Sequence, residues 1–248
     1  MRHRNEASEL SVARSYRLQV REKDVKRILR IIPWLALTTL ASANAFLAMR
    51  YLLPHVPFAP PLPNLKLHRL ALTVHAAFAG VALAIGPFEI VEGLRLRWPP
   101  LHRKLGWIYV VSVAIAGSSA IILARQASFG PVAGFGFLTL AIAWLSATGM
   151  ALKLVIQRRY TGHRRWMLRS YALTAAAITL RLLLPASAVM RLPPGLSYKA
   201  AAWLCWLINL GLVEIYLFFG SNTLLPRTTN EEMDQMARSD EFRWSRGH

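Results

Sequence analysis

Long apolar runs, separated by short polar or basic segments, dominate the chain. A helix that crosses the hydrocarbon core of a bilayer needs ~20 residues, and six of the runs reach that length. Their approximate ranges are 31–53, 69–91, 104–124, 132–156, 165–190 and 197–221. The pattern predicts an all-α polytopic membrane protein, built as a bundle of about six transmembrane helices.

This pattern also divides the chain into three parts. We predict a basic juxtamembrane segment at 1–30, a six-span transmembrane domain at 31–221 and a polar tail at 222–248. Charged and polar residues dominate the first part, so no cleavable signal peptide is recognisable. The first apolar run is therefore expected to act as its own uncleaved insertion signal.

Composition and charge agree with a membrane protein and give it an orientation. Hydrophobic residues make up 54% of the chain, and the formal net charge is +18. Lys and Arg gather before the first apolar run and in alternate loops, without any motif that reads nucleic acid. This positive-inside distribution predicts both termini in the cytoplasm, and the basic excess is then explained by topology, with no nucleic-acid partner.

The first 30 residues hold nine Lys and Arg residues together with scattered Leu and Val. One interpretation is a helix that lies on anionic lipids at the cytoplasmic surface. The other is a partly disordered basic anchor that only fixes topology.

Small and polar residues recur at helical spacing within four of the spans. They are His75, Ala79, Ala82, Gly86 and Glu89 in the second span; His102, Gly106, Tyr109, Val113 and Ala116 in the third; Gly136, Thr139, Ala143 and Ser146 in the fourth; and His163, Ser170, Thr174, Ala177 and Arg181 in the fifth. We expect these faces to point into the bundle. For the glycines and alanines, close helix packing is a sufficient explanation.

Two arginines within the fifth span need a different explanation. A charge at bilayer depth costs at least ~2.5–3.5 kcal/mol on insertion scales, so it normally faces protein or water. Arg169 and Glu214 fall at the same predicted depth. One interpretation is a buried ion pair that only holds two helices together, and the other is a functional polar site. Arg181 falls in the outer half, where its expected partners are His75, Asn209 and backbone carbonyls freed near Pro185.

His102 and His163 each stand at the cytoplasmic mouth of a span and are followed by basic residues, in HRKLGW and HRRWM. Two histidines at one depth are able to ligate a b-type haem, whose propionates Arg and Lys would meet. Interfacial histidines that cap helix starts give the same pattern. A metal site from His55, His68 and His75 is a weaker hypothesis, because no fixed spacing supports it, and we predict no metal centre.

The remaining aromatic and sulfur residues are expected to be structural. Trp144, Trp166, Trp203, Trp206, Tyr198 and Tyr216 are interpreted as interfacial anchors near span ends. Cys205 is the only cysteine and is expected to pack in a helix. No internal repeat and no catalytic or nucleotide-binding fingerprint is recognisable in the chain.

Four segments, taken in order, resemble the predicted bacterial membrane proteins of domain-of-unknown-function family 2306. They are HAAFAGVALAIGPFEI (75–90), LHRKLGWIYV (101–110), HRRWMLRSYALTAAAITLRLLLP (163–185) and AWLCWLINLGLVE (202–214). The resemblance implies a multi-span protein of the bacterial inner membrane and brings no established reaction. The positions that match are His75, Gly86, Pro87, His102, Gly106, Tyr109, His163, Arg164, Trp166, Met167, Arg169, Arg181, Trp203, Trp206, Asn209 and Glu214. Where this chain has Glu89, the resemblance leads us to expect Gln, which argues against an obligatory carboxylate there.

Three functions remain open at this point. The first is a membrane protein that binds a ligand or redox cofactor, haem or quinone, in a polar bundle interior. The second is a small-solute or proton-linked transporter, and the third is an accessory scaffold without chemistry. The candidate residues for a ligand site or polar core are His75, His102, Tyr109, His163, Arg164, Arg169, Arg181, Asn209 and Glu214.

Overall fold

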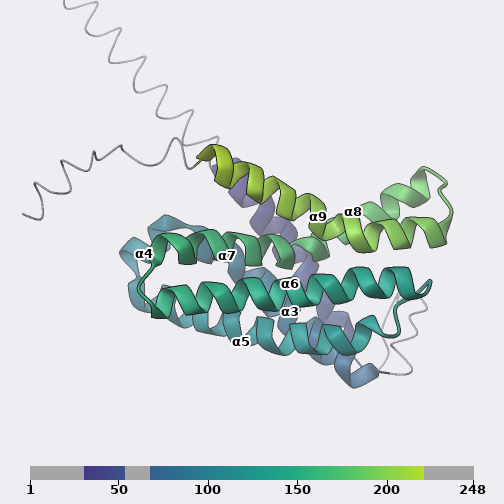
Figure 1. The fold of residues 1–248 in the computed structure, drawn as a ribbon, viewed down its shortest axis with the longest axis horizontal. Coiled ribbons are helices and arrows are strands. Elements are labelled where there is room, and N and C mark those ends of the chain that lie inside the picture. The colour runs from purple at the N-terminus through teal and green to yellow at the C-terminus, as the bar shows by residue number, and fades with distance from the viewer. Residues whose placement is uncertain (1–30, 54–67, 221–248) are drawn as a thin grey trace, which may run out of the picture.

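The computed structural model describes residues 31–53 and 68–220, and this part of the chain folds as a helical bundle without strands (Figure 1). The predicted segment 1–30, the tail 222–248 and His55 lie outside the described residues. The elements are the first helix, Ile31–Leu52, which ends in the 3-10 turn η1 (Arg50–Leu52), followed by α3 (Arg69–Ile90), α4 (Glu92–Arg97), α5 (Pro99–Ala124), α6 (Pro131–Ile156), α7 (Tyr160–Thr174), α8 (Ala176–Val189) and α9 (Pro194–Gly220).

The prediction of six spans is confirmed. Six helices of the described part are long and apolar enough to cross a bilayer, with α7 and α8 together forming the fifth span, Tyr160–Val189. Proline starts α5, α6 and α9, where its missing N–H is one that a helix start leaves unbonded anyway. Gly130, just before α6, has a φ of 92°, which glycine adopts without a Cβ penalty.

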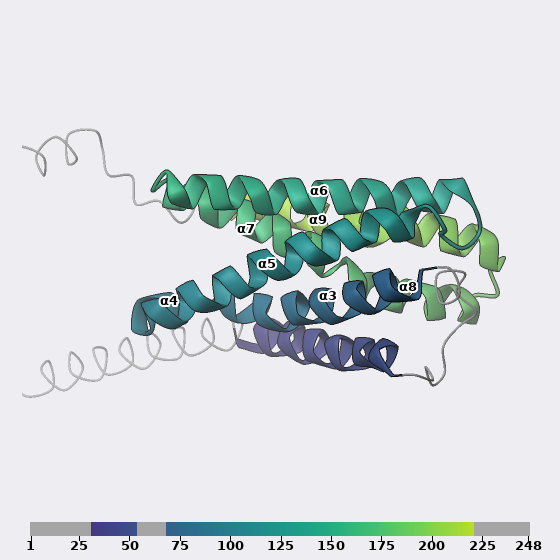
Figure 2. The same ribbon diagram turned by 90° about the horizontal axis from the view of Figure 1, so that it is seen from below.

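The helices pack in a defined order around a shared core. α3 packs chiefly against α5, α6 lies against both α5 and α7, and α9 contacts α6, α7 and α8. The first helix runs along the outer side of α3 (Figure 2), where the indole N–H of Trp34 donates to the carbonyl of Pro87 at 2.9 Å. All the predicted polar faces belong to helices that meet in one bundle. The prediction that the α6 face points inward is wrong at Thr139 and Ser146, because both side chains are exposed.

Glycines allow the closest of these contacts, as the packing interpretation predicts. A Cβ on Gly86 of α3 would stand 2.1 Å from the Tyr171 ring of α7, and one on Gly136 of α6 would meet Ala202 and Trp203 of α9 at about 3.0 Å. The Tyr171 hydroxyl also donates to the Leu83 carbonyl, at 3.3 Å. These contacts tie α7 to α3 and α6 to α9.

The fifth span is interrupted near its midpoint. α7 ends at Thr174, Ala175 is a turn residue, and α8 begins at Ala176. The break follows an alanine-rich sequence with no glycine or proline at the joint, so the sequence pattern predicts one continuous helix. A break in the middle of a span leaves backbone groups that must find partners within the protein.

Candidate functional site

One face of α5 carries the polar features of the bundle interior. His102, Gly106, Tyr109 and Ala116 follow each other at helical spacing, and each contacts a polar group on another helix. Tyr109 and Ala116 are fully buried. The predicted inward orientation of this face is therefore confirmed.

An ionisable pair occupies the start of this face. Nδ1 of His102 lies 2.9 Å from Oε2 of Glu89, and the Glu89 side chain is only 6% exposed. The two groups are not aligned for a hydrogen bond, and the described residues offer no hydrogen-bond partner to His102 Nδ1 or Glu89 Oε1. Gly106 makes room for this carboxylate, because a Cβ there would lie 3.3 Å from Oε2. A buried polar atom without a partner needs an explanation, such as water, an ion or a role in chemistry.

A hydroxyl network lies one turn further along α5. The Tyr109 hydroxyl is 2.8 Å from both Ser170 Oγ and Thr174 Oγ1 of α7. Ser170 Oγ is 2.7 Å from Thr148 Oγ1 of α6, and the Trp144 indole donates to Thr174 Oγ1 at 2.9 Å. Each hydroxyl is able both to donate and to accept. The network joins three helices in the fully buried centre.

His75 of α3 marks the far end of the same face. Its Nδ1 lies 3.0 Å from the carbonyl oxygen of Ala116. Because a carbonyl only accepts, Nδ1 is the nitrogen that donates. The α5 face thus meets an ionisable side chain at each end and hydroxyls between them.

Asn209 of α9 bridges the break in the fifth span. Its Nδ2 donates to the Ala172 carbonyl of α7 at 3.1 Å, and its Oδ1 accepts from the Thr179 hydroxyl of α8 at 2.8 Å. Ala172 belongs to the last turn of α7, whose carbonyls lack partners within their own helix. Asn209 therefore holds the two half-helices together, and it is not the predicted partner of Arg181.

Arg181 is half-buried on α8 and makes a 3.2 Å bond from Nη1 to the carbonyl of Ala177, one turn earlier. Of the predicted partners of Arg181, His75 lies within electrostatic range of its guanidinium. Tyr51 and Arg50, at the end of the first helix, were not predicted and lie within the same range. The bond to Ala177 takes the place of the predicted contacts with carbonyls near Pro185 and with Asn209.

The predicted pair of Arg169 and Glu214 is present. Nε and Nη2 of Arg169 donate to the two carboxylate oxygens of Glu214 at 2.6 and 2.8 Å. The Arg169 guanidinium also lies 4.8 Å from the centre of the Trp166 ring. The Glu214 side chain is 48% exposed, so the pair lies at the rim of the bundle and not in its core.

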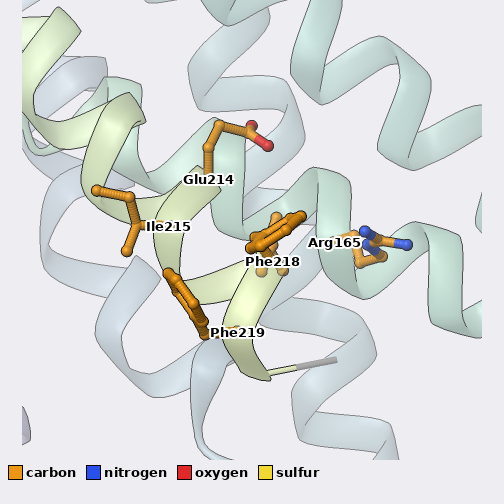
Figure 3. A pocket seen from close by; sticks show the side chains of 6 residues that line it. Arg165, Glu214, Ile215, Phe218 and Phe219 are labelled. Atoms are coloured by element: carbon orange, nitrogen blue, oxygen red, sulfur yellow. The ribbon is translucent and has the colours of Figure 1, made fainter. Parts of the chain in front are cut away.

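Next to this pair, an open hollow of about 360 Å³ is lined by Arg165, Glu214, Ile215, Leu217, Phe218 and Phe219. Figure 3 shows the Phe218 ring between Glu214 and Arg165, whose guanidinium is directed away from the carboxylate. The hollow is open and is lined mainly by residues of α9. It consequently shows an apolar recess at the end of α9 and no enclosed site.

His163 and Arg164 lie near the start of α7, away from the α5 face. Nδ1 of His163 is 2.9 Å from the carbonyl oxygen of Ala151 on α6, and the Arg164 side chain is exposed. No group of three or more His, Cys, Asp or Glu side chains suited to a metal comes together among residues 31–53 and 68–220.

Sequence reasoning missed parts of this site and misplaced others. Glu89 was set aside because the resemblance favours Gln, and Thr148 was not considered, although its helical period places it on the same side of α6 as Trp144. Trp144 and Trp206 are 4% and 7% exposed, so the prediction that they anchor the interface is wrong. A buried tryptophan and an interfacial one look alike in sequence when both stand in an apolar run.

The comparison with known protein families decides the family. The model described as "Predicted membrane protein (DUF2306)" matches residues 72–217, more than half of the chain. The chain belongs to the DUF2306 family. The match covers α3 to α9 up to Leu217 and so includes every contact of the α5 face. No curated protein and no solved structure matches this DUF2306 chain.

Proposed function

We propose that the protein is a proton-linked permease of the bacterial inner membrane, with both termini in the cytoplasm. The observation that carries the proposal is the α5 face, which meets the pair of Glu89 and His102 near its start, the hydroxyl network at Tyr109 and His75 at Ala116. Ionisable residues inside a membrane are costly, and in pumps and transporters they form proton relays.

Glu89 and His102 are the proposed entry point for the proton. Carboxylate and imidazole side chains are the groups from which proton relays in pumps and transporters are built. The unbonded Glu89 Oε1 leaves room for a proton or a water molecule. Because the resemblance leads us to expect Gln in relatives, this role is proposed for this chain alone.

The broken fifth span supports a transport role. Interrupted helices near the middle of the bilayer commonly form the substrate sites of secondary transporters, where one part of the protein moves against another. Here the break at Ala175 lies beside the hydroxyl network, since Thr174 belongs to both. We infer that the transported solute is small and polar and passes at this level.

Reconstituted vesicles test the proposal. The purified chain is placed in liposomes that contain a trapped pH-sensitive dye. A potassium gradient with valinomycin sets the membrane potential, and the dye reports the proton flux. The flux is recorded first without any added solute and then with inorganic phosphate, small carboxylates or amino acids outside the vesicles. We expect a flux above protein-free vesicles that falls roughly tenfold in Glu89→Gln, an added barrier of ~1.4 kcal/mol, and also falls in Tyr109→Phe.

The matched control is Ser118→Ala, which removes an exposed hydroxyl of α5 that bonds only to the Ala114 carbonyl of its own helix. Flux in this variant should equal that of the unmodified protein. If no condition gives flux above empty vesicles, or if Glu89→Gln and Ser118→Ala behave alike, the proposal is wrong.

A second candidate, a b-type haem protein, is favoured by one specific observation. Nδ1 of His163 lies within hydrogen-bond distance of the Ala151 carbonyl oxygen, which leaves its Nε2 for another partner. Metal-ligating histidines are commonly oriented in this way, whereas His102 lies beside Glu89 without such a bond. The basic residues that follow each histidine would meet the propionates. Absorption spectra of protein made with haem supplied test this: a Soret band lost in both His102→Ala and His163→Ala supports it, and a colourless protein rejects it.

A further inference from the structure

The carboxylates of the described chain are confined to one end of the bundle. Glu89 ends α3, Glu92 begins α4 and Glu214 lies near the end of α9. The sequence contains no Asp or Glu from 25 to 88 or from 93 to 213. We call the side that holds these three residues the carboxylate end.

Arg181 lies toward the opposite end. It stands 12 residues beyond Arg169, which pairs with Glu214 at the carboxylate end. At 1.5 Å per residue this separates the two arginines by roughly 18 Å along the span. Every loop and helix end on the side of Arg181 belongs to the two acid-free stretches of sequence. The counter-ion of Arg181 therefore does not come from these segments.

Other positively charged or polar groups converge on Arg181 from two further helices. The three helices meet one turn before Arg181, where Ile178 of α8 packs with Ala41 of the first helix and Leu83 of α3. Arg50 and Tyr51 of the first helix and His75 of α3 lie within electrostatic range of the Arg181 guanidinium. The end of the first helix is fixed beside α3, because the Thr73 hydroxyl donates to the Tyr51 carbonyl at 3.1 Å. The Arg50 guanidinium lies 5.1 Å from the centre of the Tyr51 ring and donates to its hydroxyl at 3.2 Å.

We propose that Arg181, with Arg50, Tyr51 and His75 beside it, forms a binding site for a phosphate-like oxyanion. The proposal is independent of proton transport, because it rests on the opposite end of the bundle and not on Glu89 and His102. The ligand is either a free inorganic or small organic phosphate, or the phosphate of a lipid headgroup.

The chemistry of these side chains selects an oxyanion. A guanidinium presents five N–H donors in a planar fork that matches phosphate and carboxylate oxygens. Nη1 of Arg181 donates to the Ala177 carbonyl at the long distance of 3.2 Å. This bond uses one of the five N–H donors of the guanidinium. Two guanidinium groups within electrostatic range repel each other, and an anion between them converts that repulsion into attraction. A half-buried setting strengthens the effect, since screening by water is reduced there.

Thermal unfolding of the full-length chain in a neutral detergent tests the proposal, because a ligand that binds the folded state raises its Tm. One arm adds sodium phosphate against sodium chloride at equal ionic strength. The other adds phosphatidylglycerol against phosphatidylcholine in mixed micelles. We expect a rise in Tm in at least one arm for the unmodified protein and for Arg125→Gln, which removes an exposed arginine at the end of α5.

Arg181→Gln should abolish that rise. Arg181→Lys, which keeps the charge without the fork, should fold and bind roughly tenfold more weakly. A rise with phosphate identifies a soluble anion as the ligand, and a rise with phosphatidylglycerol alone identifies a lipid headgroup. The proposal is overturned if neither arm raises the Tm of the unmodified protein. It is equally overturned if Arg181→Lys responds like Arg125→Gln, even where Arg181→Gln does not fold.

Discussion

Arg169 and Arg181 lie in the same span, yet their surroundings differ in kind. Arg169 is held by two short bonds to Glu214 and by the Trp166 ring. Arg181 has one long bond to its own helix and the Arg50 guanidinium within electrostatic range. The first arrangement is complete within the protein, whereas the second has no acidic residue in the sequence segments around it. The contrast shows that the role of an arginine inside a membrane depends on whether an acidic residue lies at the same depth.

The joint between the two arginines should give the largest effect on stability. Asn209→Leu removes the bonds to Ala172 and Thr179 that hold α7 and α8 together and leaves two polar groups unpaired. Leaving a buried polar group unsatisfied costs about 1–3 kcal/mol, so we expect a loss of about 2–3 kcal/mol in the free energy of unfolding. Denaturant unfolding in mixed micelles measures it. Asn209→Leu with unchanged stability would show that the bridge contributes nothing.

The next largest effect should come from Arg169. Arg169→Gln leaves the Glu214 carboxylate without its cation, and we expect a loss of about 1–2 kcal/mol, discounted because Glu214 is half-exposed. Added salt should reduce the difference between the variant and the unmodified protein. The same unfolding measurement at low and high salt checks both statements.

Exchanging the charges sharpens this result. The double variant Arg169→Glu with Glu214→Arg restores an ion pair across α7 and α9, though without the contact to the Trp166 ring. We expect it to recover most of the loss and to remain within about 1 kcal/mol of the unmodified protein. A double variant no more stable than Arg169→Glu alone would mean that the geometry matters and the charges do not.

Arg181→Gln should have the smallest effect when no phosphate or acidic lipid is added. The substitution removes a charge for which the nearby segments supply no carboxylate, and it loses one weak bond. We expect a change within about 0.5 kcal/mol in either direction. A loss as large as that of Arg169→Gln would show that Arg181 is stabilised by the protein itself and would remove the difference between the two residues.

Much of this arrangement follows from the sequence, because bilayer thickness dictates helix length. The six spans and the pair of Arg169 and Glu214 needed only apolar run lengths and predicted depths. The break at Ala175 could not be predicted, since no glycine or proline marks it and its cause is tertiary. Asn209 was assigned to the wrong partner for the same reason. Its true partner is the Ala172 carbonyl, which lacks a partner in its own helix only because the span is broken. Glu89 was discounted through a resemblance, although its place on the inward face of α3 already put it beside the polar residues of α5.

The interrupted span also has a mechanical consequence. α7 is fastened to α3 through Gly86 and Tyr171, while α8 packs against α9 (Figure 1). Ala175 and the side chain of Asn209, which bonds to both half-helices, link α8 to α7. Arg181 stands six residues past Ala175, a lever arm of about 9 Å. A tilt of about 10° at this pivot would carry the base of its side chain through about 1.6 Å, which is enough to make or break a hydrogen bond while α3 and α7 stay still.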